Sequence, residues 1–200
     1  ILDAAANAFE AHAGEIFAVL AREAGKGLPD AVAEPREAVD LLRYYAAEAR
    51  GMSEAQARGI WSCISPWNFP MATAVWKIAP ALAFGNAVVF KPANLVPASA
   101  WALTEIISRQ EFPAGTFNLV MGSGGETGEA LINSPQIQAL TFTGSLEVGR
   151  RIASATVANL VKCQLEMGSK NALIVVDDAD VDLAVEAAFN GSYSGSGQKC

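Results

Sequence analysis

From Ile60 onward, short apolar segments alternate with stretches of helical periodicity, and this alternation limits the folds open to the chain. The apolar segments are rich in β-branched and aromatic residues and read IWSCIS, NAVVFKP, TFNLVMG, ALTFTG, VKCQLEMG and NALIVV. Helical patterns such as PASAWALTEIISRQ, ETGEALINS and EVGRRIASATVANL lie between them. Strands that alternate with helices form parallel sheets, so the sequence predicts an α/β fold with a doubly wound parallel sheet.

The spacing of the predicted strands supports this fold. Phe90, Phe117, Phe142 and Leu165 lie near successive strand ends, at intervals of 27, 25 and 23 residues, which fits right-handed βαβ units. The strands run into KPAN, MGSGG, TGS and MGS. Ligands of open α/β sheets bind beyond the carboxyl ends of the strands, so we expect a Rossmann-like cofactor cleft at these four exits.

Two helices are expected before the sheet. Apolar residues that include Phe9 and Ile16 recur at helical spacing over residues 3–25, which predicts one amphipathic helix. A second helix is predicted from about Pro35 to Arg50, because proline is tolerated in the first helical turn. The YSGSGQK segment before Cys200 is predicted to be a loop.

The composition excludes several classes of protein. A hydrophobic content of 52% with 18% charged residues is enough for a sizeable core. The net charge of −7 opposes binding to a phosphate backbone, so no nucleic-acid partner is expected. No apolar run approaches the ~18 residues that span a bilayer, and the first residues lack a signal-peptide pattern. A cytoplasmic protein without a membrane partner is therefore expected.

The three cysteines suggest neither a disulfide framework nor a metal site, because they are widely spaced and accompanied by a single histidine, His12. Cys63 and Cys163 lie in predicted strands and are expected to be core thiols. Cys200 follows a glycine-serine stretch, where a thiol is open to chemistry. If Cys200 is a nucleophile, its base is expected to be a carboxylate, and Glu166 at a strand exit is a candidate.

The strand exits contain further candidate binding groups, each with an ordinary structural alternative. TGSLEVG (143–149) could cradle a phosphate at a helix N-terminus or be a simple glycine turn. GSGGETG (122–128) has one residue too many for the G-x-G-x-x-G pattern, so taken alone it is more often a loop than a site. Asn68 in PWNFP could donate a hydrogen bond to a ligand or cap a turn, and Lys91 could reach a ribose or phosphate or be solvated.

Together, SPWNFP, GNAVVFKPA, FTGSLEVG, LEMGSKNALIVVDDADVDLAV and GSGQKC resemble the aldehyde dehydrogenase family in order and spacing. The resemblance covers nearly all of residues 60–200, and the preceding segment resembles the N-terminal helices of this family. It implies that Cys200 attacks an aldehyde to give a thiohemiacetal and then a thioester. Asn68 would hold the oxyanion, and Glu166 would activate the hydrolytic water.

The same resemblance implies a cofactor, NAD or NADP, and a set of residues around it. In many members a glutamate stands three residues after the lysine, whereas this chain has Asn94, so we expect NADP to be tolerated alongside NAD. The residues expected to contact the dinucleotide are Ile64, Ser65, Pro66, Trp67, Lys91, Gly124, Gly144, Ser145, Val148, Met167 and Gly168.

The two parts of the chain resemble different branches of the family. Residues 60–200 are similar to α-ketoglutaric semialdehyde dehydrogenases, and residues 1–50 are similar to the pyrroline-5-carboxylate dehydrogenase module of proline-oxidising enzymes. The expected substrate is a short carboxylated semialdehyde, with glutamate semialdehyde or a non-catalytic dinucleotide-binding role as alternatives. Residues 1–168 would form the N-terminal helices and cofactor domain, and 169–200 would begin a catalytic domain. A homo-oligomer is expected of the full-length form, and residues 1–200 alone are expected to be inactive.

Overall fold

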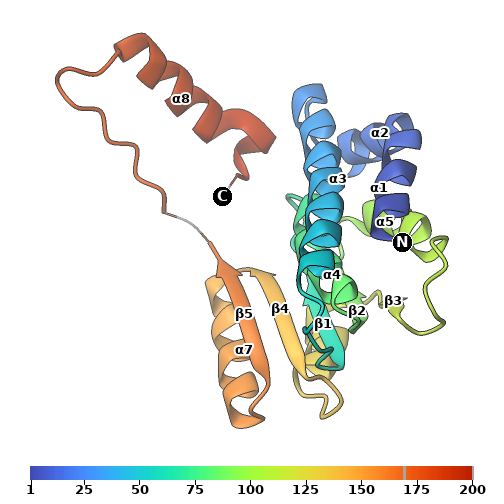
Figure 1. Cartoon of the computed structure of the whole chain (residues 1–200). Helices are drawn as coiled ribbons and strands as arrows, with labels where there is room; N and C mark the ends of the chain where they lie inside the picture. The colour runs from blue at the N-terminus through green and yellow to red at the C-terminus, as the bar shows by residue number, and fades with distance from the viewer. Residues whose placement is uncertain (169, 200) are drawn as a thin grey trace.

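The computed structural model describes residues 1–168 and 170–199 of the chain. Three helices precede an alternating series of strands and helices, and a long extended segment then leads to a last helix (Figure 1). The elements are α1 (Leu2–Ala11), α2 (Ala13–Glu23), α3 (Leu28–Gly51), β1 (Ile60–Ile64), α4 (Ala72–Ala83), β2 (Ala87–Lys91), α5 (Pro97–Ser108), β3 (Phe117–Leu119), η1 (Gly124–Gly128), α6 (Glu129–Ile132), β4 (Ala139–Gly144), α7 (Leu146–Ala158), β5 (Lys162–Met167), α8 (Val181–Tyr193) and η2 (Ser194–Gly197).

The five strands form one parallel sheet in the order β3-β2-β1-β4-β5, which confirms the predicted fold class. The chain runs outward from β1 to β3 on one side and then returns to β4, which pairs with β1 on the other side. The order of the strands therefore reverses between β1 and β4. A crevice beyond the carboxyl ends of the strands is expected at such a switch point.

Consecutive residues of β1 face two different hydrophobic clusters. Cys63 packs in the larger cluster with side chains of α1 to α5, including Phe9 and Ile78. Ile64 and Phe142 pack in a smaller cluster with Ile152 of α7. This two-residue alternation buries the centre of the sheet on both faces, with α4 packed on one face and α7 on the other.

The N-terminal helices differ from the sequence prediction. Residues 3–25 form two helices instead of one, because the backbone leaves the helical conformation at His12, with φ −102° and ψ 16°. Phe9 and Ile16 are both buried, so the apolar period continues across the break and hides it in the sequence. Helix α3 begins at Leu28, not near Pro35, with a proline in its first turn and Pro35 inside it. Burial of Ala31 and Ala38 on either side of Pro35 sustains the helix there.

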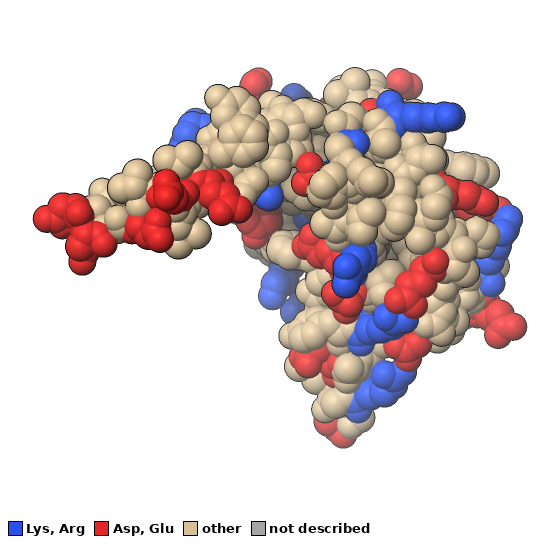
Figure 2. Space-filling view, turned by 90° about the horizontal axis from the view of Figure 1, so that it is seen from above, with Lys and Arg blue, Asp and Glu red and all other residues tan. Residues whose placement is uncertain are grey.

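The predicted strand NALIVV is wrong: residues 171–176 have no strand structure. Among the described residues no strand pairs with this segment, and Leu173, Ile174, Val175 and Val176 are exposed. A β-branched run becomes a strand only where a neighbour supplies backbone hydrogen bonds. The run is part of an arm, residues 170–193, that ends in α8, and acidic side chains gather at the far end of this arm (Figure 2).

Edge strand β5 is more exposed than its sequence predicted. Cys63 is fully buried as expected, but Cys163 on β5 is only half-buried, because no further strand covers the edge among the described residues. Helix α4 was not among the predicted elements, and Pro80 within it obscures its helical pattern. None of the helices in the described part of the chain has the length and the apolar character needed to cross a bilayer.

Candidate functional site

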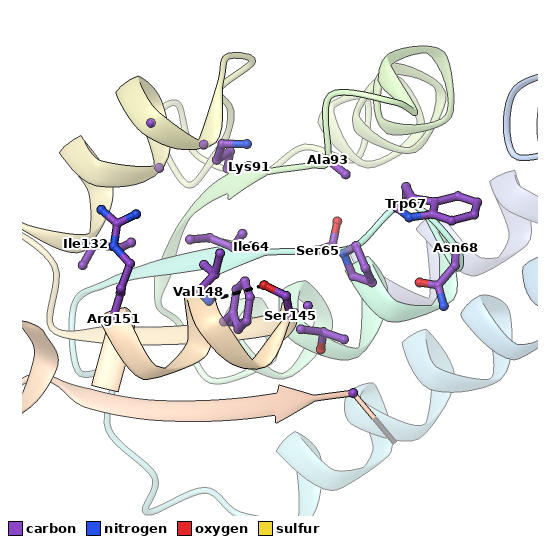
Figure 3. A pocket seen from close by; sticks show the side chains of 18 of the residues that line it. Ile64, Ser65, Trp67, Asn68, Lys91, Ala93, Ile132, Ser145, Val148 and Arg151 are labelled. Carbon is purple, nitrogen blue, oxygen red and sulfur yellow. Dashed lines mark hydrogen bonds between the residues drawn. The ribbon is translucent and has the colours of Figure 1, made fainter. Parts of the chain in front are cut away.

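A cavity of about 670 Å³ opens where β1, β2 and β4 end, at the reversal of the strand order (Figure 3). Its volume lies within the range of about 300–1,000 Å³ that is typical of ligand pockets. Ten of the residues that the sequence assigns to a dinucleotide line it: Ile64, Ser65, Pro66, Trp67, Lys91, Gly124, Gly144, Ser145, Val148 and Gly168. The structure thus brings together residues that lie more than a hundred positions apart.

Met167 is the predicted cofactor residue that does not line the cavity. Its side chain packs instead against the backbone of Gly149 on α7, so closely that a Cβ atom on Gly149 would collide with the Met167 sulfur. Met167 therefore fixes the distance between α7 and β5. The prediction that it contacts a cofactor is not supported by this placement.

The TGSLEVG segment places the N-terminus of a 13-residue helix at the cavity. The Ser145 hydroxyl accepts a hydrogen bond of 3.3 Å from the backbone N–H of Val148 and so caps α7. Gly144 has no space for a side chain, because a Cβ atom there would lie 2.5 Å from Cζ of Phe142. Unpaired N–H groups and the helix dipole at this end favour an anion.

The second glycine segment also borders the cavity. Gly124–Gly128 form a single π-helical turn, η1, and the Ser123 hydroxyl accepts a hydrogen bond of 3.1 Å from Glu126 N–H. Gly124, Gly125 and Gly128 line the cavity and present backbone without side chains. The extra residue that interrupts the G-x-G-x-x-G pattern lies within this turn.

Lys91 ends β2 with its side chain largely buried beside the cavity. Its ammonium donates a hydrogen bond of 3.0 Å to the Pro92 carbonyl, and burial lowers the pKa of Lys91. The Nζ retains two further N–H groups that can reach a ligand. Asn94, three residues on, is exposed and does not line the cavity.

An ion pair at the cavity was not predicted from the sequence. Arg151 of α7 binds Glu129 of α6 at 2.5 Å, and both residues line the cavity. Arg151 lies one helical turn after Val148, so the helical period places it on the same face and could have identified it. The other lining residues that the sequence reasoning missed are Ala93, Gly125, Gly128, Ile132, Phe142, Thr143 and Gln198.

Asn68 lies at the end of the cavity beside Trp67 (Figure 3). Its side-chain Nδ2 donates a hydrogen bond of 2.9 Å to the backbone carbonyl of Gln198, two residues before Cys200. An amide carries two N–H groups, so one remains for a ligand. Cys200 itself lies outside the described residues, and the predicted meeting of its thiol with Glu166 stays a prediction.

Glu166 lies on β5 opposite Thr143 and is exposed, but it does not line the cavity. Gln164, on the same face of β5, donates a hydrogen bond of 2.8 Å to Oε1 of Glu166. The Thr141 hydroxyl donates to the Gln164 side-chain carbonyl at 2.5 Å. This pair of hydrogen bonds orients the carboxylate from the body of the sheet.

Lys77 of α4 begins the same series of contacts. Its ammonium donates a hydrogen bond of 3.3 Å to the Thr141 hydroxyl. Burial lowers the pKa of Lys77 to about 8, and the nearby Cys63 and Glu166 oppose that shift. Burial raises the pKa of Cys63 to about 12, so this thiol is unsuited to act as a nucleophile at neutral pH.

Comparison with known proteins finds similar chains over the whole of residues 1–200. The chain is 40% identical to the alpha-ketoglutaric semialdehyde dehydrogenase of Bacillus subtilis, over 98% of this chain and 43% of the relative. It is 38% identical to the 2,5-dioxopentanoate dehydrogenase of Saccharolobus solfataricus, over 100% of this chain and 45% of the relative. The chain therefore spans less than half the length of these curated relatives.

Solved structures show the same fold. An NADP-dependent enzyme of E. coli superposes with a TM-score of 0.95 at 36% identity, covering 100% of this chain and 44% of that one. A betaine aldehyde dehydrogenase variant from Staphylococcus aureus, in complex with NAD+, gives 0.94 at 31%, covering 100% and 43%. A proline utilization A variant of Bradyrhizobium japonicum gives 0.95 at 34%, covering 100% and 22%.

A family model described as the aldehyde dehydrogenase family matches residues 1–200. This match covers both the N-terminal helices and the sheet, so the two parts that resemble different branches belong to one family. The cavity at the strand exits, the capped helix N-terminus and Asn68 occupy a fold that family members share. The chain belongs to the aldehyde dehydrogenase family.

Proposed function

We propose that the full-length protein oxidises a short aldehyde to a carboxylic acid, with NAD or NADP as hydride acceptor. The main support is the arrangement of one cavity: ten of the eleven predicted dinucleotide residues line it, and Asn68 at its end is hydrogen-bonded to the segment that leads to Cys200. Nucleophile and oxyanion donor would thus meet where a nicotinamide would end.

The described residues fit a dinucleotide. The N-terminus of α7 and the closely approachable backbone at Gly144 suit a pyrophosphate, and the Lys91 ammonium suits a ribose hydroxyl. The apolar side chains of Ile64, Ile132 and Val148 suit the flat faces of an adenine. When bound, the nicotinamide accepts a hydride.

In the proposed reaction the Cys200 thiolate forms a bond to the aldehyde carbon, and the carbonyl electron pair moves to oxygen. The free N–H of the Asn68 amide, with the Cys200 backbone N–H, stabilises that oxyanion. As the carbonyl re-forms, the hydride leaves the carbon with its electron pair, giving a thioester. Glu166 then takes a proton from water, which attacks the thioester and releases the acid and the thiol.

The preferred substrate in this proposal is a short carboxylated semialdehyde, such as α-ketoglutaric semialdehyde. Two relatives are named for that substrate under its two names, and they match the chain from end to end. Glutamate semialdehyde is the alternative, supported by the proline utilization A structure.

A pre-steady-state burst tests the chemistry. Mixing the full-length protein with NAD and α-ketoglutaric semialdehyde is expected to give a rapid burst of NADH absorbance, because we expect hydride transfer to be faster than the thioester hydrolysis that follows it. Cys200→Ser should abolish the burst, whereas Cys163→Ser, which removes a half-buried thiol on β5, should leave it intact. A burst that survives in Cys200→Ser would contradict covalent catalysis.

Cofactor choice is proposed to be relaxed. The exposed Asn94 leaves the β2 exit without the carboxylate that would repel a 2′-phosphate. We expect NADP to support turnover alongside NAD, and Asn94→Glu to raise the KM for NADP by roughly tenfold or more through like-charge repulsion. The measurement is a titration of each cofactor at saturating aldehyde, with Asn94→Gln as the neutral control. Strict use of NAD by the unmodified protein would refute the proposal.

A further inference from the structure

A buried ion pair lies beneath the turn that carries Asn68. Lys26 Nζ and Glu34 Oε2 are 2.9 Å apart, and their side chains are 2% and 1% exposed. Neither of these two atoms has another hydrogen-bond partner among the described residues. A buried ion pair is a weak source of stability, because the desolvation of its two charges offsets their attraction. The contribution of this pair lies instead in the geometry that it imposes on the neighbouring chain.

The pair contacts the chain on the C-terminal side of Asn68. The second carboxylate oxygen of Glu34 accepts hydrogen bonds of 2.7 Å from Met71 N–H and 3.1 Å from Ala72 N–H, at the start of α4. The Lys26 ammonium lies 3.8 Å from the centre of the Phe69 ring. The pair therefore fixes the residue after Asn68 and the helix that follows it.

The same N-terminal segment also holds the chain that leads to Cys200. Asp30 accepts a hydrogen bond of 3.0 Å from Gly195 N–H, and the Gly25 carbonyl accepts one of 3.2 Å from the Ser196 hydroxyl. The hydrogen bond from the Asn68 side chain to the Gln198 carbonyl links this segment directly to the turn that carries Asn68. Residues 25–34 thus touch both chain segments that the proposed reaction needs.

We propose that Lys26, Asp30 and Glu34 are positioning residues, which set the Asn68 amide and the 194–198 segment at a fixed distance from each other. They touch neither aldehyde nor cofactor, and they act through Asn68 and through the chain that ends at Cys200. This inference rests on the proposed function, because it assigns a role in oxyanion binding to the geometry of Asn68.

The main test isolates the hydrogen bonds of Glu34 from its charge, in the full-length protein. Lys26→Met combined with Glu34→Gln removes both charges but keeps an oxygen that can accept from Met71 and Ala72 N–H. Lys26→Met combined with Glu34→Leu removes the charges and the acceptor. The comparison is the kcat of the Leu variant against that of the Gln variant, with the KM for NAD measured in both.

We expect the Leu variant to have a kcat roughly tenfold or more below that of the Gln variant, with KM for NAD changed less than twofold, since misaligned oxyanion donors act on the transition state. The loss should vanish when both variants also carry Asn68→Ala, because residues that act through one another are not additive. An equal loss in both backgrounds, or no loss in either, would overturn the inference.

The Asn68→Ala variant distinguishes failure of the proposed function from failure of the positioning role. If Asn68→Ala alone leaves kcat unchanged, Asn68 is no oxyanion donor, and both the reaction scheme and this inference fall. If Asn68→Ala slows turnover but the losses add, only the positioning role falls.

A second variant covers the case in which the Leu variant does not fold. Asp30→Ala removes the acceptor of Gly195 N–H at a half-buried position. We expect faster hydrogen exchange in residues 194–198 and a lower kcat, both restored by Asp30→Asn, whose side-chain oxygen can accept the same bond. Unchanged exchange and kcat in Asp30→Ala would overturn the inference.

Discussion

The shifted pKa of Lys77 should be visible in the pH dependence of the free energy of unfolding. In the folded protein burial lowers the pKa of Lys77 from 10.5 to about 8, so above pH 8 the unfolded chain binds more protons at this residue than the folded one. The free energy of unfolding should therefore rise with pH, by up to about 1 kcal/mol between pH 8 and 9. The raised pKa of Cys63 works in the opposite direction from about pH 8 upward, because the unfolded thiol loses its proton first, and it offsets part of this rise.

Urea unfolding at pH 8.0, 8.5 and 9.0 checks this prediction. Lys77→Met should remove the rise, because it removes the titrating group. Lys162→Met, which deletes an exposed lysine of β5, should preserve it. A rise of the same size in Lys77→Met would show that another group is responsible.

At the residue scale, the sequence identifies groups that lie near strand exits and misses groups that act from a distance. Lys91, Ser145 and Asn68 follow predicted strands, and parallel topology brings such positions to one edge. Lys26 lies between two glycines after the first predicted helix and Glu34 lies just before the second, where charges look solvent-exposed, and only the tertiary structure buries them together. A buried pair leaves no periodic signal in the sequence.

At the scale of elements, a predicted strand forms where at least one described neighbour pairs with it. The five runs at β1 to β5 are strands as predicted, including the edge strands β3 and β5. Residues 171–176 have the same β-branched composition but pair with no described strand. Composition sets the capacity to form a strand, whereas a partner decides whether one forms.

The capping of α7 by Ser145 provides a prediction at this scale. Ser145→Ala should lower the free energy of unfolding by about 1 kcal/mol, because the Val148 N–H loses its acceptor at the helix N-terminus. Ser154→Ala is the matched control, since Ser154 is exposed inside α7, where alanine is favoured. Chemical denaturation of both variants measures the difference, and equal stabilities would count against a capping role.

At the scale of the whole molecule, the contacts of the arm of residues 170–193 leave much of its apolar surface exposed. Large apolar side chains on it are exposed, including Val181, Leu183, Val185, Phe189 and Tyr193 on α8. An apolar surface of this extent marks an interface. Residues 1–200 match less than half the length of the relatives, so we propose that this arm is covered by chain that the relatives possess outside the matched region.

Residues 1–200 produced alone are expected to bind NAD weakly and not to oxidise an aldehyde. The cavity residues are present, so weak binding of NAD is expected, but an uncovered arm cannot hold the segment that leads to Cys200 firmly enough for turnover. Calorimetric titration with NAD should give an affinity at least roughly tenfold weaker than in the full-length protein, which is the size of effect expected when binding must also order a segment. Absorbance at 340 nm should show no NADH from an aldehyde. Robust oxidation by residues 1–200 would mean that the arm is already in its working position, and that the exposed apolar face of α8 serves another purpose.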